Sequence, residues 1–176
     1  MHPAPQGVGF SAISDKKTLS QSAFAVISNW YYYAILEMTF KTDFSSHTSD
    51  IAKKLGISVL EAELAIERLQ NLGLLTKDAQ GKWQKSKGNI SDLEIASRPG
   101  TDRHVQILNK ASKAIREQDF NMREFHSVTF CIDKSFLPDA KEKIRHFLED
   151  MNLLLESGAR EEVYELSVAL FSLEKN

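Results

Sequence analysis

The chain has 176 residues, 42% of them hydrophobic and 26% charged, as in an ordinary globular protein of one or two small domains. A single cysteine, Cys131, excludes an internal disulfide and a cysteine-rich zinc site. The most apolar window, residues 24–40, is interrupted by polar side chains, and no signal-peptide pattern is visible. We therefore expect a cytoplasmic protein without membrane contact.

The formal net charge of −2 is spread evenly along the chain. Residues 24–90 carry eight Lys and Arg against seven Asp and Glu, and residues 91–176 carry twelve against sixteen. A domain that binds nucleic acid strongly through phosphates normally shows a marked basic excess. Neither half has such a basic excess, so we expect no strong non-specific binding to nucleic acid.

The N-terminal part is predicted to be a disordered arm over residues 1–23, rich in Pro, Gly, Ser and Gln, followed by a helix. Ser28 is the expected N-cap of that helix. Apolar residues at helical spacing and three consecutive tyrosines follow, and we expect them to pack in the core or an interface. These residues are Trp30, Tyr31, Tyr32, Tyr33, Ala34, Ile35 and Met38.

Two more helices and a hairpin are predicted after this first helix. One helix runs from Ser49 or Asp50 to Leu55 and ends at Gly56. The next opens with a capping box, Ser58 and Glu61, and continues to Gly73. "LLTK", the turn "DAQG" and "KWQKS" then alternate as two strands. Three helices followed by a hairpin predict a winged helix-turn-helix over residues 24–88.

The rest of the chain is predicted to be a second subdomain over residues 101–176, in the order helix–strand–helix–strand, after a linker at residues 87–100. The first helix, residues 102–118, should bury Val105, Leu108, Ala111 and Ile115. "EFHSVTFCID" and "EVYELSVALFSLE" alternate as strands on either side of a long amphipathic helix, and Cys131 is expected to be a small buried residue. Two strands do not make a stable sheet, so we expect a missing strand from the first domain or a second subunit. The fold class is thus α+β, with a homodimer as the expected assembly.

Catalytic and metal-binding motifs are missing from the sequence: there is no phosphate-binding loop, no dinucleotide-binding turn and no H-E-x-x-H. No histidine lies at metal-ligand spacing from another. We expect no catalytic residue, no metal and no cofactor, and therefore no enzyme. The weakest of the alternatives is an enzyme with His104, His126 and Arg123 in one cleft.

The DNA-binding hypothesis rests on the winged-helix pattern and is opposed by charge. The predicted recognition helix presents Glu63 and Glu67, which would face a polyanion, although Glu can accept a hydrogen bond from cytosine. Positive charge lies instead on the preceding helix and on the wing. The expected DNA-binding residues are Lys53, Lys54, Arg68, Lys82 and Lys85. Five phosphate contacts, from Lys53, Lys54, Lys82, Lys85 and Lys87, would give a log–log salt slope of about −4 to −5.

Several stretches together resemble a family of bacterial proteins catalogued as a domain of unknown function, with many paralogues in some genomes. They are "FAVISNWYYYAILEM", "LGIS", "LGLL…GKW", "RHVQILNKASKAI", Arg123 and "VYELSVALFSLEK". Family members usually end in "LFPL", where this chain has Phe171-Ser172-Leu173. The resemblance implies a transcription-regulator-like protein. Longer members look as if they carry a further helix-turn-helix domain first, so this chain resembles a short paralogue or the C-terminal part of a longer protein.

Two hypotheses of different class follow. In the first, the winged helix contacts DNA and the tail dimerises or senses a signal. In the second, the winged helix is a scaffold for a protein–protein interaction or dimerisation without DNA binding. The expected partner or dimer interface then comprises Trp30, Tyr32, Phe171 and Leu173, with Tyr31 and Tyr33 beside them.

Overall fold

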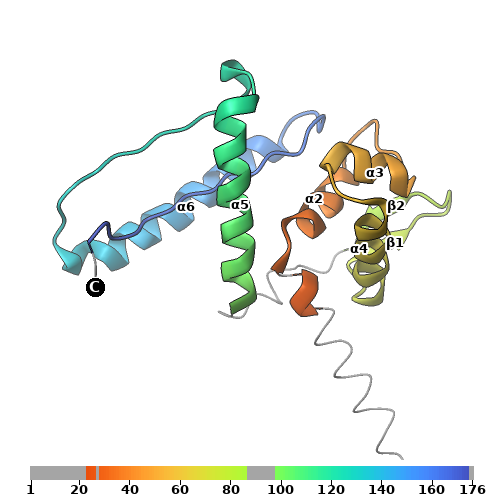
Figure 1. The fold of residues 1–176 in the computed structure, drawn as a ribbon, viewed down its shortest axis with the longest axis horizontal. Coiled ribbons are helices and arrows are strands. Elements are labelled where there is room, and N and C mark those ends of the chain that lie inside the picture. The colour runs from red at the N-terminus through yellow and green to blue at the C-terminus, as the bar shows by residue number, and fades with distance from the viewer. Residues whose placement is uncertain (1–22, 27, 87–97, 175–176) are drawn as a thin grey trace, which may run out of the picture. The chain divides into compact units, whose positions relative to one another are not determined.

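A computed structural model describes residues 23–26, 28–86 and 98–174 (Figure 1). The predicted arm at residues 1–23 and the predicted linker at residues 87–100 fall almost entirely outside them. The chain divides into two compact units, residues 1–108 and 109–176, and the division falls inside one helix. Over the described residues, helices are combined with one two-stranded antiparallel sheet, an arrangement compatible with the α+β class.

The first unit contains three consecutive helices and a hairpin. Helix α2 spans Trp30–Met38, α3 spans Thr48–Leu55 and α4 spans Val59–Asn71. Strands β1 (Leu75–Lys77) and β2 (Trp83–Lys85) pair antiparallel, with Leu75 opposite Lys85. The order and approximate limits of these elements are as predicted from the sequence.

The predicted N-cap of the first helix is wrong by one residue. Ser28 lies inside a preceding helical turn, where its hydroxyl donates to the carbonyl of Phe24 at 2.8 Å. Asn29 is extended and occupies the N-cap position, so α2 begins at Trp30. The hydroxyl of Ser28 is engaged within its own turn and caps nothing downstream.

The core of the first unit is built from the apolar faces of α2, α3, α4 and the hairpin. Its largest fully buried side chains are Val26, Tyr32, Ile35, Leu36, Ile51, Leu69 and Leu75. Gly56 and Gly73 end α3 and α4 with φ of 66° and 68°, which a side chain would disfavour. The core therefore fixes α3, α4 and the hairpin against one another.

The capping box at the start of α4 is present as predicted. The amide of Glu61 donates to the Ser58 hydroxyl oxygen at 3.2 Å, and the amide of Ser58 donates to the Glu61 carboxylate at 2.8 Å. Hydrogen bonds from Ser58 hold the pKa of Glu61 below its usual range. Both halves of the motif thus stabilise the first turn of α4.

Replacement of Ser58 by alanine is expected to lower the free energy of unfolding by about 1 kcal/mol, because the amide of Glu61 loses its acceptor and the Glu61 carboxylate loses the Ser58 hydroxyl. Urea denaturation followed by tryptophan fluorescence measures the change, since Trp30 and Trp83 both lie in the first unit. Ser49→Ala, an exposed serine on α3, is the control. The stabilisation that the Glu61 carboxylate provides is present above the ordinary pKa of Glu. It is lost as the pH falls through the lowered pKa of Glu61. Equal effects of the two variants would contradict the assigned cap.

Helix α5 spans Arg98–Glu117, but its buried stripe is not the predicted one. Val105, Leu108 and Ile115 are each about half exposed, whereas Ile107 is buried. Gln106 donates to the carbonyl of Ser28 at 2.9 Å. The Arg103 guanidinium lies 4.1 Å from the ring centroid of Tyr33. These contacts, which apolar spacing alone did not predict, turn Arg103 and Gln106 toward α2 and the turn before it.

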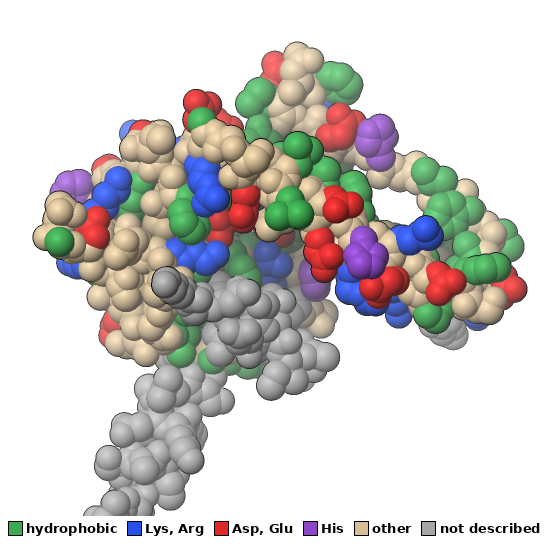
Figure 2. Space-filling view, turned by 180° about the vertical axis from the view of Figure 1, so that it is seen from behind, with side chains coloured by type: hydrophobic (Ala, Val, Ile, Leu, Met, Phe, Trp, Pro, Cys, Tyr) green, Lys and Arg blue, Asp and Glu red, His purple; other side chains and the backbone are tan. Residues whose placement is uncertain are grey.

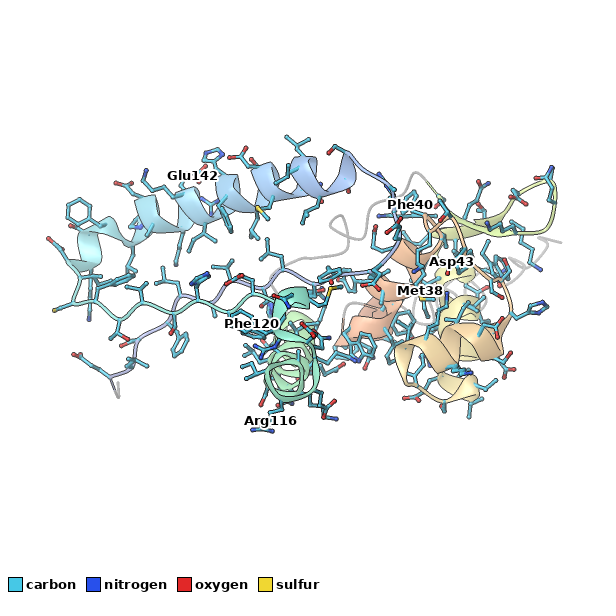
Figure 3. The ribbon with its side chains drawn as sticks, turned by 90° about the horizontal axis from the view of Figure 1, so that it is seen from above. Met38, Phe40, Asp43, Arg116, Phe120 and Glu142 are labelled. Carbon is cyan, nitrogen blue, oxygen red and sulfur yellow. The ribbon has the colours of Figure 1, made fainter. Side chains whose placement is uncertain are left out.

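The second unit contains the end of α5 and α6, which spans Leu137–Glu156, with short 3₁₀ turns at Phe120–Met122 and Lys134–Phe136. The two predicted strands are not formed in the described residues: residues 123–133 and 159–173 have no regular secondary structure. Figures 1 and 3 show both as extended chain that runs toward the N-terminal end of α6. A strand requires a hydrogen-bonded neighbour, and the described residues supply none to either segment.

No described residue from Asn109 to Glu174 is buried, and Cys131, predicted to be buried, is exposed. Figure 2 shows apolar side chains at the surface in many places. Among the helices that the structure describes, none combines the length and apolarity needed to span a bilayer.

Candidate functional site

The loop at residues 40–44, between α2 and α3, is the place where predicted DNA-binding residues meet. Figure 3 labels two of its residues, Phe40 and Asp43. Lys54 on α3 approaches the loop through Asp43, whose Oδ2 lies 3.1 Å from its Nζ. The hydrogen bond from Lys54 holds the pKa of Asp43 below its usual range. The loop thus holds the end of the Lys54 side chain in place.

The two predicted lysines of the hairpin reach the same loop through its aromatic rings. The Nζ of Lys82 lies 5.8 Å from the ring centroid of Phe44. The Nζ of Lys85 lies 5.7 Å from the ring centroid of Phe40, and it is paired with Glu37 at 2.8 Å. Cations at this distance from an aromatic face are attracted by the ring. We call Lys54, Lys82 and Lys85 the lysine cluster.

Backbone contacts fix the hairpin beside this loop. The amide of Trp83 donates to the hydroxyl of Ser46 at 3.2 Å, and the amide of Lys85 donates to the hydroxyl of Thr39 at 3.2 Å. Lys41 adds a fourth cation, 3.5 Å from Asp43, although its side chain is only 13% exposed. Phe40, Lys41 and Phe44 were not predicted from the sequence as part of this site. The only signal in the sequence was the loop itself, "FKTDF", which interleaves aromatic and charged residues.

Arg68 does not belong to the lysine cluster. It is half-buried on α4, and its guanidinium donates to the hydroxyl of Tyr32 at 2.7 Å. That hydrogen bond raises the pKa of Arg68 further above its usual value. Because Arg68 satisfies the hydroxyl of a buried tyrosine, its role in this structure is to support the core. Lys53, the fifth predicted residue, is exposed on α3 next to Lys54.

The predicted interface residues separate into two kinds. Tyr32 is 0% exposed, so its assignment to a partner surface is corrected: the side chain fills the core and is stacked on Tyr31 at 4.9 Å. Trp30 is half-buried and meets Tyr31 edge to face. Burial raises the pKa of Tyr31 to about 12. Phe171 and Leu173, by contrast, are more than 70% exposed in the second unit.

The exposed surface of α4 is apolar and acidic. Val59, Leu60 and Leu64 are between 38% and 63% exposed, and Glu63 and Glu67 are exposed beside them. Side chains three and four residues apart share a helix face, so Leu60, Leu64 and Glu67 form one surface. This face lacks the cations that normally meet phosphates.

The alternative catalytic residues gain no support from their surroundings. His126 has an 84% exposed side chain and lies 2.7 Å from Glu124. Arg123 lies over the rings of Phe120 and Phe125, at 5.8 Å from each centroid. His104 is exposed on α5. Within the described residues, no group of three His, Cys, Asp or Glu side chains is arranged to hold a metal ion.

The sequence profile of the family described as "Domain of unknown function (DUF4423)" matches residues 12–173. The chain belongs to this family. The match covers both units and confirms the resemblance to a domain of unknown function that the sequence stretches indicated. No curated protein matches the chain. No solved structure matches it either.

Proposed function

We propose that this DUF4423 protein is a cytoplasmic, transcription-regulator-like protein whose residues 24–88 form a winged-helix module that contacts DNA. The observation that carries the proposal is the convergence of Lys54, Lys82 and Lys85 on the loop at residues 40–44. Two separate elements, α3 and the hairpin, contribute the three lysines, of which Lys54 is paired with Asp43 and Lys85 with Glu37. Basic surfaces with aromatic side chains attract the phosphate backbone.

The order α2–α3–α4–hairpin supports the winged-helix assignment. In that arrangement α4 corresponds to the recognition helix and the hairpin to the wing. Since α4 exposes Glu63 and Glu67, the proposed contact is made mainly by the hairpin and by α3, to phosphates rather than to base edges. Moderate affinity with little sequence preference follows from such a contact.

The test is binding of the whole chain to a mixed-sequence duplex, measured by fluorescence anisotropy over a range of salt concentrations. Four lysines, the lysine cluster and Lys53, predict a log–log slope of about −3 to −4. Micromolar affinity with that slope supports the proposal. No binding at low salt, or binding that is insensitive to salt, contradicts it.

A second candidate, a protein-docking module, is favoured by the exposed apolar residues of α4. Val59, Leu60 and Leu64 form an uncovered apolar strip bordered by Glu63 and Glu67. A partner for this strip would combine apolar and basic side chains. In this hypothesis the lysine cluster binds no DNA, so the salt titration distinguishes the two candidates.

A further inference from the structure

The second unit exposes two extended segments with the sequence pattern of buried strands. They are residues 125–132, "FHSVTFCI", and residues 166–173, "LSVALFSL". Neither contains Asp, Glu, Lys, Arg, Pro or Gly. Natural edge strands are normally protected from association by charges, prolines or bulges. Two segments of eight residues without such protection have the composition of strands that are paired on both sides.

The backbone groups of these two segments have no ladder partner. Within the part of the chain that the structure describes, no backbone hydrogen bond joins either segment to another residue, and the only sheet is β1–β2. The hydroxyl of Tyr164 donates to the carbonyl of Met122 at 3.3 Å, just before both segments begin. The segments start near each other, yet they form no sheet together. An additional strand is therefore needed to complete the ladder.

Many large apolar side chains of the second unit are exposed. Nineteen of them, between Ile115 and Leu173, are at least 37% exposed. With on the order of 100 Å² from each, they present roughly 1,900 Å² in total over the unit. A standard interface takes about 800 Å² from each partner, and obligate dimers take more.

The strands that the structure describes in the first unit are too short to complete the ladder. Strands β1 and β2 have three residues each, whereas each unpaired segment has eight. A second copy of this chain supplies two strands of matching length and the same apolar composition. Two segments without charge also meet without like-charge repulsion. A second copy of the chain can therefore pair with the backbone of both segments and cover their apolar side chains.

We infer that the second unit is completed by a second copy of the chain, with residues 125–132 and 166–173 pairing across the interface into one intermolecular sheet. The apolar face of α6 that carries Phe147 and Leu154, 48% and 65% exposed, is covered in the same step. The inference is independent of DNA binding, because every residue involved lies from Ile115 onward.

The first test uses the unaltered chain. Sedimentation velocity is expected to give twice the monomer mass of 19.9 kDa at micromolar concentration. A spin label on Cys131, the single cysteine, lies inside the first segment and reports directly on the interface. Pulsed dipolar spectroscopy is expected to give a defined distance between two labels. A monomer mass well above micromolar concentration, or a dimer without a defined Cys131–Cys131 distance, overturns the inference.

The second test is Val168→Pro, which removes a backbone donor from the middle of the second segment. Its dimer dissociation constant is expected to rise at least about tenfold. Ala159→Pro, in the exposed turn after α6, is the matched control and leaves the constant unchanged. Tryptophan fluorescence shows whether the first unit remains folded in both variants, since Trp30 and Trp83 lie there. Equal dissociation constants for the two variants, with the first unit folded in both, also overturn the inference.

Discussion

Replacement of Leu69 by alanine is expected to lower the free energy of unfolding of the first unit by about 2–5 kcal/mol. Leu69 lies on α4 and is 0% exposed within the core that joins α2, α3 and the hairpin. The variant loses the buried apolar surface of three carbon atoms and leaves a cavity. Because the core is well packed, we expect it to collapse only partly around the cavity.

Urea denaturation followed by the fluorescence of Trp30 and Trp83 measures this loss in the unit that contains Leu69. The control is Gln70→Ala, the exposed neighbour on the same helix, which should change stability by less than about 0.5 kcal/mol. A loss below about 1 kcal/mol for the Leu69 variant would show that α4 does not pack as described.

Simultaneous replacement of Lys54, Lys82 and Lys85 by glutamine is expected to weaken DNA binding at low salt at least about tenfold. The salt slope should become shallower by about 3, close to one unit for each lost phosphate contact. We expect this joint effect because all three lysine side chains lie around the loop at residues 40–44. Because Glu37 loses the ion pair with Lys85 and Asp43 keeps only that with Lys41 in the variant, thermal unfolding must be measured in parallel.

A variant with equal charge change provides the control for the lysine cluster. Lys113, Lys141 and Lys143 are exposed in the second unit, and their replacement by glutamine removes the same three charges. A contact localised at the cluster predicts little change in affinity for this control. Equal weakening by the two triple variants would mean that net charge alone governs binding.

The first unit was largely predictable from the sequence because its signals are local. The capping box at Ser58 and Glu61 set the start of α4, and Gly56 and Gly73 set the ends of two helices. In α4, Ala62, Ala65, Ile66 and Leu69 recur at helical spacing and are buried. Each of these features depends on a few neighbouring residues.

The second unit was less predictable because its outcome depends on partners far along the chain or outside it. The alternation of "EFHSVTFCID" indicated a strand, but a strand forms only where a neighbour supplies hydrogen bonds. The face of α5 was also mispredicted. Polar contacts of Gln106 and Arg103 decide its rotation, and the spacing of Val105, Leu108 and Ile115 does not.

For the candidate site, the sequence identified the lysines but not their arrangement. Lys54, Lys82 and Lys85 meet because the hairpin folds back beside the loop at residues 40–44, a long-range contact that no local pattern encodes. Arg68 was predicted to be a surface cation, yet its guanidinium donates a hydrogen bond to the hydroxyl of the buried Tyr32. An arginine on the outward face of a predicted helix gives no sign of such a partner.

The most direct test of the proposed function is an NMR titration of the isotopically labelled whole chain with a short mixed-sequence duplex. The account predicts that the largest shift changes fall on the loop at residues 40–44, on the hairpin and on the side-chain signals of Lys54, Lys82 and Lys85. The exposed face of α4 around Leu60 and Glu63 should change little. Shifts concentrated on that face, or no shifts at low salt, would contradict DNA contact through the lysine cluster.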